Sequence, residues 1–276
     1  MAADDTAPRF GRETSGQARS GALARGLHVV EVLVDAAAPL SIGDIAKATG
    51  LESHTVHRLL QGLIENGYAV RHTASKRIIA GPRAYFPKRL YHPLSELRRQ
   101  VHARLADLRD AHGETTAFVL FVGMERVIVD SAQGSEHLGP YYDDTWMDAP
   151  LHGSMSGKIM LMDMTEAERR LYLGSGPYPG IADKTTTDPA EFERQLDELR
   201  AKGYGSIQDT LFAGVTAIAA PVRARDRIIG CLVVVGTTAR LDADRAEAIG
   251  ADLKATADLV ARGTPALRPV AHLLGV

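Results

Sequence analysis

Residues 25–70 read RGLHVVEVLVDAAAPLSIGDIAKATGLESHTVHRLLQGLIENGYAV, and apolar side chains recur along this stretch at intervals of three and four. That interval places them on one face of a helix, so the pattern predicts helices rather than strands. Pro39, Gly50 and Asn66-Gly67 mark points where helical segments end. We therefore expect three short helices, over residues 25–36, 42–50 and 53–65.

Capping residues and two strand-like runs add to the evidence from the helices. Ser41 and Asp44 have the spacing of a capping box at the start of the second helix, and Ser53 or a neighbour is expected to cap the third. Beyond the third helix, residues 68–71 and 77–80 are short strand-like runs around a polar turn. Three helices followed by a small ribbon are typical of a winged helix-turn-helix.

The third helix carries side chains suited to reading DNA. Its first turns expose residues that can hydrogen-bond, and a helix of this size fits the major groove, where it can reach base edges. Basic residues of the wing and of the segment before the first helix could meet phosphates or the minor groove. The alternative is an ordinary solvated surface. The expected DNA contacts are Arg19, Arg25, Ser41, Ser53, His54, Thr55, His57, Arg58, Arg71, Lys76 and Arg77.

Composition limits the class of protein. The chain has 276 residues, 45% of them hydrophobic, and a formal charge of -2, so it can bury a core, and any DNA-binding surface must be local. Its single cysteine, Cys231, excludes a disulfide framework. No secretory signal or bilayer-length apolar run occurs, and residues 1–20 have the composition of a flexible basic arm. A cytoplasmic protein without a membrane segment is expected.

The rest of the chain has a different pattern. After residues 21–88, the winged module, an apolar stripe over Ser95–Ala111 predicts a linking helix within residues 89–112. Beyond it, residues 113–276 alternate between apolar strands and amphipathic helices. The expected strands are 117–122, 127–129, 217–222 and 228–235, and the expected helices are 151–162, 189–202 and 242–262. These elements predict an α+β domain with helices laid on a mostly antiparallel sheet.

Several motifs resemble one family in the same order. Residues 25–70, above all Thr55-Val56-His57-Arg58-Leu59-Leu60, resemble the winged-helix region of the IclR family of bacterial transcriptional regulators. PLHGSMSGK at 150–158, LDELRAKGY at 196–204 and GVTAIAAPV at 214–222 resemble its effector-binding domain. The resemblance implies a GAF-like second domain that binds a small molecule and alters operator binding. It also implies a homodimer or a dimer of dimers, which suits a palindrome-like site.

The resemblance also implies where the effector would lie. Carried over residue by residue, the backbone amides that hold a small acid fall on Met155 and Ser156, and the loop contacts fall on Gln208 and Asp209. The far wall falls on Val215, Ala217, Val233 and Val235. Further lid or wall contacts are expected from Tyr141, Tyr142, Trp146 and His152, for which core packing is the alternative.

The wall residues also indicate the class of effector. Relatives often carry serines where this chain has Val233 and Val235, and a cysteine in place of Ala217. Because these hydrocarbon positions offer no donors to a small keto acid, we expect a bulkier effector, an apolar or aromatic acid. The start of the third helix also differs from the family pattern. Glu52-Ser53-His54-Thr55 replaces the family's common Pro-Lys-Ser-Thr, so the operator preference need not match that of relatives.

Two rival functions remain open. The second domain could be a small-metabolite enzyme with a DNA-tethering head, or the protein could be an architectural DNA binder without a ligand. Against catalysis, Met155 stands where a nucleophile elbow needs serine, and Gly157-Lys158 lacks the remaining residues of a phosphate-binding loop. We expect no catalytic residues, no cofactor and no metal site, and we expect Cys231 to be an inert core thiol.

Overall fold

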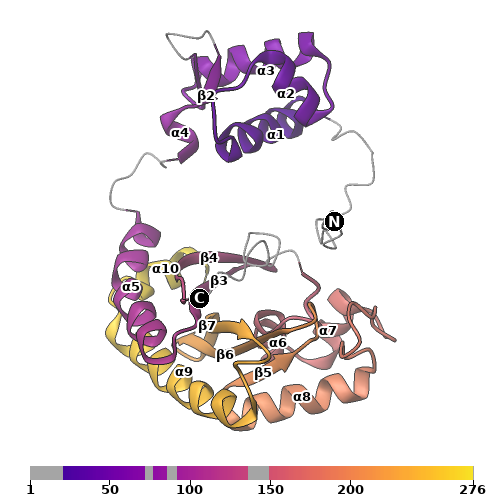
Figure 1. Ribbon diagram of the computed structural model, residues 1–276, viewed down its shortest axis with the longest axis vertical. Helices are drawn as coiled ribbons and strands as arrows, with labels where there is room; N and C mark the ends of the chain where they lie inside the picture. The colour runs from indigo at the N-terminus through magenta and orange to yellow at the C-terminus, as the bar shows by residue number, and fades with distance from the viewer. Residues whose placement is uncertain (1–20, 72–76, 86–91, 136–148, 276) are drawn as a thin grey trace, which may run out of the picture. The chain divides into compact units, whose positions relative to one another are not determined.

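The computed structural model describes residues 21–71, 77–85, 92–135 and 149–275, and the chain forms two compact units that divide between His92 and Pro93. The N-terminal unit comprises α1 (Ala22–Asp35), α2 (Ile42–Thr49), α3 (Ser53–Glu65), β1 (Ala69–Arg71), β2 (Ile78–Ala80) and α4 (Pro82–Tyr85) (Figure 1). This order confirms the predicted winged helix-turn-helix. The additional helix α4 spans only four residues, too few to produce a helical repeat in the sequence.

The apolar repeat of the three longer helices forms the core of this unit. Val29 of α1, Ile45 of α2 and Val56 of α3 are completely buried together, while polar positions between them face solvent. Burial of these faces stabilises the unit by about 1.5–3 kcal/mol for each large side chain. Helix packing of this kind leaves the opposite face of α3 available for contacts outside the unit.

The predicted capping box at α2 is present. The Ser41 hydroxyl accepts a hydrogen bond from the Asp44 backbone amide at 3.1 Å, and the Asp44 carboxylate accepts one from the Ser41 amide at 2.8 Å. Gly50 ends α2 with a φ of 67°, a left-handed conformation that glycine adopts without a steric cost. Of the two alternatives for the cap of α3, Ser53 is wrong and a neighbour is right: the cap residue is Glu52, although the Glu52 side chain makes no capping hydrogen bond.

The C-terminal unit contains a sheet with helices on both faces. Its elements are α5 (Pro93–His112), β3 (Thr115–Val122), β4 (Glu125–Ala132), α6 (Met155–Met162), α7 (Glu166–Leu173), α8 (Pro189–Lys202), β5 (Gly205–Gln208), β6 (Val215–Ala224), β7 (Arg227–Thr237), α9 (Ala243–Gly263) and α10 (Leu267–Leu273). The strand order is β4-β3-β7-β6-β5, with antiparallel pairing throughout. The predicted α+β domain is confirmed.

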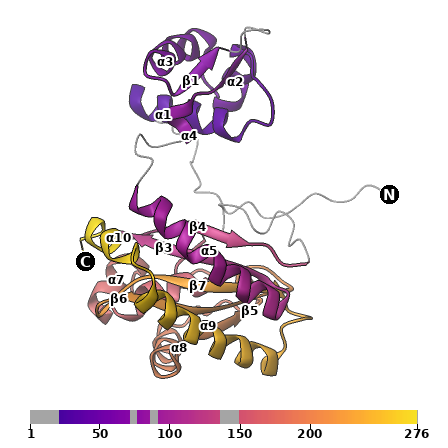
Figure 2. The ribbon, with the colours of Figure 1, turned by 90° about the vertical axis from the view of Figure 1, so that its left-hand side faces the viewer.

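Residue alternation explains why the central strands are almost continuously apolar. In β7, Leu232 and Val234 pack toward α5, α9 and α10, whereas Cys231, Val233 and Val235 pack toward α6 and α8. Figure 2 shows one of these layers, with α5 and α9 lying in front of the sheet. Because both faces are covered, successive residues are buried on opposite sides, and the usual polar alternation disappears.

Three details of the second unit differ from the expectations. The apolar stripe of α5 packs against the sheet and forms part of its core. The helix expected from residue 151 begins instead at Met155, after the cap residue Ser154. The strand β5 and the helix α10 were not expected, because four and seven residues are too few for a clear repeat. The helix α7 was not expected either, because its buried residue is Arg169 and it has no buried apolar stripe.

Candidate functional site

The first turns of α3 present a polar, exposed surface. Ser53, His54, His57 and Arg58 are exposed, and Thr55 is half-buried beside them. The Thr55 hydroxyl lies 3.3 Å from Nε2 of His54, which links the two side chains on the helix surface. On the opposite side, Val56 and Leu60 are buried in the core. The helix is therefore amphipathic, with its hydrogen-bonding groups directed outward.

The other predicted DNA contacts are distributed around the N-terminal unit. Arg71 is exposed at the end of β1, and Arg25 on α1 donates from Nε to the Gly21 carbonyl. Arg77 donates to the Pro39 carbonyl at 3.1 Å and lies 3.5 Å from the Asp44 carboxylate. Ser41 caps α2, as described above. Arg19 and Lys76 lie outside the described residues.

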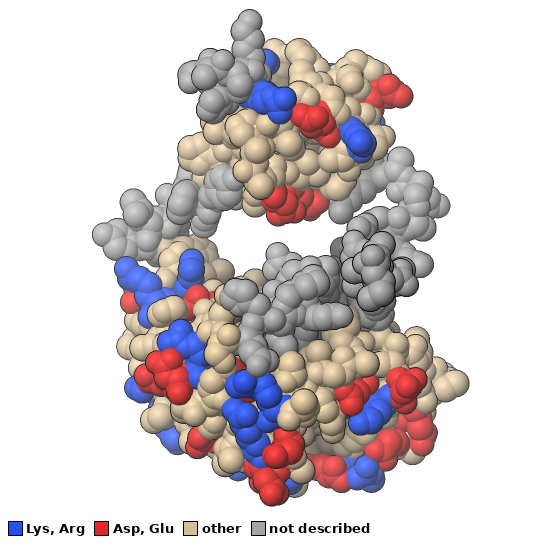
Figure 3. Space-filling model, in the orientation of Figure 1, with Lys and Arg blue, Asp and Glu red and all other residues tan. Residues whose placement is uncertain are grey.

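Charge on this unit is mixed rather than uniformly basic. On the face drawn in Figure 3, basic and acidic side chains intermingle over the described residues of both units. The face drawn provides no broad positive field, so attraction of DNA phosphates to it depends on a few well-placed cations.

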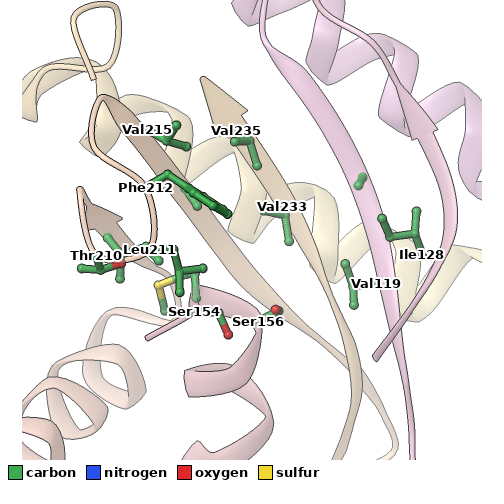
Figure 4. Close-up of a pocket in the computed structure, with 14 residues that line it drawn as sticks. Val119, Ile128, Ser154, Ser156, Thr210, Leu211, Phe212, Val215, Val233 and Val235 are labelled. Carbon is green, nitrogen blue, oxygen red and sulfur yellow. The ribbon is translucent and has the colours of Figure 1, made fainter. Parts of the chain in front are cut away.

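A cavity opens in the C-terminal unit between the sheet and the start of α6. It is lined by Ala117, Val119, Ile128, Ser154, Met155, Ser156, Ile207, Thr210, Leu211, Phe212, Val215, Ala217, Val233 and Val235. Figure 4 shows the valines of the strands on one side and Ser154 and Ser156 at the start of α6 on the other. The walls are almost entirely hydrocarbon, and hydroxyl groups from Ser154, Ser156 and Thr210 are the exceptions among the lining side chains.

Local structure fixes the polar end of this cavity. The Ser154 hydroxyl caps α6 by accepting from the Gly157 amide at 3.2 Å. A Cβ at position 157 would lie 2.2 Å from the Leu151 carbonyl oxygen, so only glycine allows the preceding turn to pack this closely on the helix. Thr210 joins the other side of the cavity to this turn, because its hydroxyl donates to the Gly153 carbonyl at 2.9 Å.

A buried arginine lies behind these serines. Arg126 of β4 donates from Nη1 to the Ser154 hydroxyl at 2.5 Å and to the Ser156 hydroxyl at 3.2 Å, and from Nη2 to the Ala149 carbonyl. Only 6% of its surface is exposed. The cavity therefore has a hydrocarbon body and a hydroxyl-lined end whose serines are hydrogen-bonded from behind by Arg126.

The structure brings six of the predicted effector contacts together in this cavity. They are Met155, Ser156, Val215, Ala217, Val233 and Val235. Tyr141, Tyr142 and Trp146 lie outside the described residues.

The other three predicted contacts do not line the cavity. His152 is buried against the Tyr178 ring, its Nε2 donates to the Pro179 carbonyl at 2.9 Å, and burial lowers its pKa against the opposing effect of that hydrogen bond. Gln208 ends strand β5 rather than lying in a loop, and its side chain is exposed.

Asp209, the third of them, shapes the loop that contributes to the cavity. Its carboxylate accepts hydrogen bonds from Lys184, the Gly214 amide and Thr238, at 2.9, 2.7 and 3.0 Å. The hydrogen bond from Lys184 is the largest cause of its lowered pKa. These bonds hold the turn that presents Thr210, Leu211 and Phe212 to the cavity.

Several cavity residues, and Arg126 behind them, were missed by sequence reasoning. Ser154 stands within PLHGSMSGK, where its cap spacing to Gly157 was a usable signal. Arg126 follows a turn and is followed by apolar residues, and nothing in that local pattern distinguishes it from a solvated strand residue.

Lys158, one turn into α6, is also buried. Its Nζ donates to Oε1 of Gln195 at 2.5 Å and lies 5.9 Å from the centre of the Phe192 ring. Burial lowers the pKa of Lys158 to about 8, although the nearby Glu191 carboxylate opposes the shift. The side chain faces α8 and does not line the cavity beside the sheet.

Two features are absent from the described residues. Within residues 21–71, 77–85, 92–135 and 149–275, no three His, Cys, Asp or Glu side chains are grouped so that they could hold a metal ion. In the same part of the chain, no helix is both long and apolar enough to span a bilayer.

Comparisons with known proteins match both units. The family model of the bacterial transcriptional regulator IclR C-terminal domain matches residues 92–262, and the IclR helix-turn-helix model matches residues 22–73. A probable transcriptional regulator, SauR of Cupriavidus necator, is 28% identical and covers 87% of this chain and 95% of its own. The transcriptional repressor IclR of Escherichia coli is 24% identical over 86% of each chain.

Solved structures share the fold. An IclR homolog from Microbacterium hydrocarbonoxydans, complexed with 4-hydroxybenzoate, has a TM-score of 0.73 at 22% identity and covers 90% of this chain and 100% of its own. IclR of Thermotoga maritima has a TM-score of 0.68 at 21% identity, covering 87% and 97%. Together with the family models, which span both units, these matches confirm the predicted resemblance. The protein belongs to the IclR family of bacterial transcriptional regulators, with an N-terminal helix-turn-helix domain and a C-terminal effector-binding domain.

Proposed function

We propose that α3 reads operator DNA through Ser53, His54, Thr55, His57 and Arg58. The observation that carries this proposal is their common exposure on the first two turns of a helix whose other face is buried in a helix-turn-helix core. Hydroxyl, imidazole and guanidinium groups can pair with base edges in the major groove. Arg25, Arg71 and Arg77 would contact the backbone, together with Arg19 and Lys76, and Ser41 would contact DNA beside α2.

We further propose that the protein acts as a homodimer or a dimer of dimers in the cytoplasm. One helix of this size reads only a few base pairs, whereas a two-fold pair reads two half-sites and gains both affinity and specificity. Residues 21–88 would form the DNA-binding domain, residues 1–20 a basic arm and residues 113–276 the effector-binding domain, with residues 89–112 between them.

The effector that best suits the cavity is an apolar or aromatic acid. Valine, alanine, leucine and phenylalanine walls favour a hydrocarbon body, and the serines at the start of α6 favour a polar head. The complex of the Microbacterium homolog with 4-hydroxybenzoate supports this class, since that molecule has an aromatic body and an acid group. Regulation requires the acid to bind DNA-competent and DNA-incompetent states with different affinity.

Footprinting on the DNA upstream of the protein's own gene and in neighbouring intergenic regions tests the operator proposal. We expect protection at a two-fold symmetric site, and a change in protection when a cognate acid is added. Weak protection without sequence preference would favour an architectural DNA binder instead.

We infer that the C-terminal unit binds its acid without converting it. The support is the hydrocarbon lining of the cavity, which brings no nucleophile and base together among its described side chains. Incubation of the protein with each stabilising acid, followed by chromatography, should return the acid unchanged. A new product that depends on the protein would favour the enzyme alternative.

A further inference from the structure

The effector cavity meets solvent at an apolar end. Of its lining residues, Ile128, Phe212 and Val215 are half-buried and the others are buried. These three half-buried residues form the mouth of the cavity. All hydroxyl-bearing residues of the lining are among the buried ones, so the polar end lies inside. An acid with an apolar tail would find its hydrogen-bond partners inside and would leave the end of its tail at the mouth.

A short loop between β5 and β6, residues 209–214, forms one side of the mouth. Both of its ends have a left-handed backbone, with a φ of 57° at Asp209 and 79° at Gly214, and the Asp209 carboxylate accepts a hydrogen bond from the Gly214 amide at 2.7 Å. The Asp209 amide donates to the Val215 carbonyl at 2.9 Å, and the Val215 amide donates to the Phe212 carbonyl at 3.3 Å. These bonds close the loop on itself and fix the backbone that carries Phe212.

Contacts outside the loop hold it against the rest of the unit. The Thr210 carbonyl accepts a hydrogen bond from the Thr185 hydroxyl at 2.6 Å. Leu211 is buried beside Gly153, where a Cβ would lie 2.7 Å from Cδ1 of Ile181 and 3.1 Å from Cδ2 of Leu211. Glycine at position 153 therefore leaves room for both side chains. The loop cannot withdraw from the cavity without breaking a buried hydrogen bond and exposing Leu211.

Phe212 is therefore held at the mouth by the loop. It is the largest side chain, and the one aromatic ring, among the described residues that line the cavity. Figure 4 shows it extending from the loop across the cavity toward the strand that carries Val233. We propose that Phe212 sets the length of the apolar tail that the effector cavity accepts. The proposal rests on the effector function proposed above and names the residue that selects among apolar acids. A tail that is too short leaves space unfilled, and one that is too long must displace the ring or extend into water.

Titration calorimetry on the full-length protein tests this selection with two series of acids. Unbranched acids from butanoate to decanoate, and benzoates from benzoate itself to 4-butylbenzoate, lengthen by one methylene at a time. In the wild type, affinity should rise by about fourfold per added methylene and then fall once the tail is longer than the space in front of the ring. Phe212→Ala should shift the tightest acid of each series to a tail that is longer by about two carbons or more. Phe212→Leu should give a smaller shift in the same direction.

A matched variant separates selection from a general effect of losing an aromatic ring. Tyr172→Ala removes a side chain that is 53% exposed on α7 and does not line the cavity. It should leave the tightest acid of each series unchanged. Phe212→Leu keeps an apolar side chain on the loop, so it tests the proposal if Phe212→Ala does not fold. Thermal unfolding of each variant, followed by circular dichroism, establishes which of them are folded.

The outcomes distinguish the two proposals. If the folded Phe212 variants keep the tightest acids of the wild type, whether all affinities are equally weakened or unchanged, Phe212 does not set the length and the acid effector stands. Wild-type affinity that still rises at the longest acid of both series would overturn the selection in the same way. If no acid of either series binds the wild type, the acid effector falls, and the selection by Phe212 falls with it.

Discussion

The two candidate sites of this protein are built in opposite ways. The proposed DNA-reading surface of α3 lies within six consecutive residues, 53–58, and its hydrogen-bonding side chains are exposed to solvent except for the half-buried Thr55. The effector cavity draws its lining from residues between Ala117 and Val235, and the serines at its polar end are held by the buried Arg126. The first site is a property of one helix, whereas the second exists only after five strands and a helix have assembled.

This difference has an energetic consequence. Exposed side chains of α3 are solvated and screened before DNA binds, so each contributes a modest, salt-dependent amount. Buried groups of the C-terminal unit have already lost their water, and their charges interact in a medium with a lower dielectric constant than water. The same kind of residue is therefore expected to respond differently to substitution, salt and pH in the two units.

The largest expected effect is on DNA binding. The double variant His57→Ala/Arg58→Ala should weaken operator binding by about 100-fold or more, since each lost base contact costs about 1–3 kcal/mol. Both side chains are exposed, so the melting temperature should stay close to that of the wild type. Fluorescence anisotropy with the footprinted operator, at two salt concentrations, measures the loss.

The matched control for this variant is Arg262→Ala. Arg262 is an exposed cation at the end of α9 that pairs with Asp258 at 3.7 Å. The Arg262→Ala variant should leave operator affinity unchanged. Equal affinities of the double variant and the wild type would show that α3 does not read the site.

A second effect concerns pH and belongs to the buried groups of the C-terminal unit. The pKa of Lys158 is about 8 in the folded chain and near 10.5 when unfolded. Between these values the unfolded state binds more protons, so stability rises with pH. Burial raises the pKa of Cys231 above its usual range, so the unfolded thiol ionises first and stability falls as pH increases above about 8.5.

These opposing slopes can be separated by substitution. From pH 7 to pH 10, the free energy of unfolding of Lys158→Met should fall by about 2 kcal/mol relative to that of the wild type, and that of Cys231→Ala should rise by a similar amount. Denaturant unfolding of the full chain at each pH measures both slopes. If the stability of Lys158→Met and of the wild type changed with pH in the same way, folding would not lower the pKa of Lys158.

The winged unit could be predicted almost completely from the sequence because its signals are local. The Ser41-Asp44 spacing, the apolar face of α3 and the left-handed residue at Gly50 each depend on neighbours within one or two turns. The prediction missed the short helix α4, began α1 at Arg25 instead of Ala22, and did not anticipate that α3 begins without a side-chain cap.

The cavity could be predicted only in part, for a physical reason. Val233 and Val235 were identified through the family resemblance, and their strand places them on the α6 side of the sheet. Arg126 could not be identified this way, because its burial depends on the pairing of β4 with β3 and on the turn at Ser154, 28 residues away in the chain. No pattern within a window of the sequence carries that information.

The smallest expected effect compares the two units directly through their capping boxes. Ser41-Asp44 begins α2, and Thr165-Glu168 begins α7 with the same reciprocal hydrogen bonds. Ser41→Ala and Thr165→Ala should each destabilise their own unit by about 1 kcal/mol, because a capped amide loses its acceptor. Thermal unfolding and operator anisotropy should be measured on both variants.

DNA binding then shows whether Ser41 has a second role. Thr165→Ala should leave operator affinity unchanged, since α7 belongs to the effector-binding unit. If Ser41→Ala weakens operator binding under conditions where the winged unit stays folded, its hydroxyl proton serves DNA while its oxygen serves the cap. Unchanged operator affinity in Ser41→Ala would restrict Ser41 to the cap and confine the reading surface to α3 and its basic neighbours.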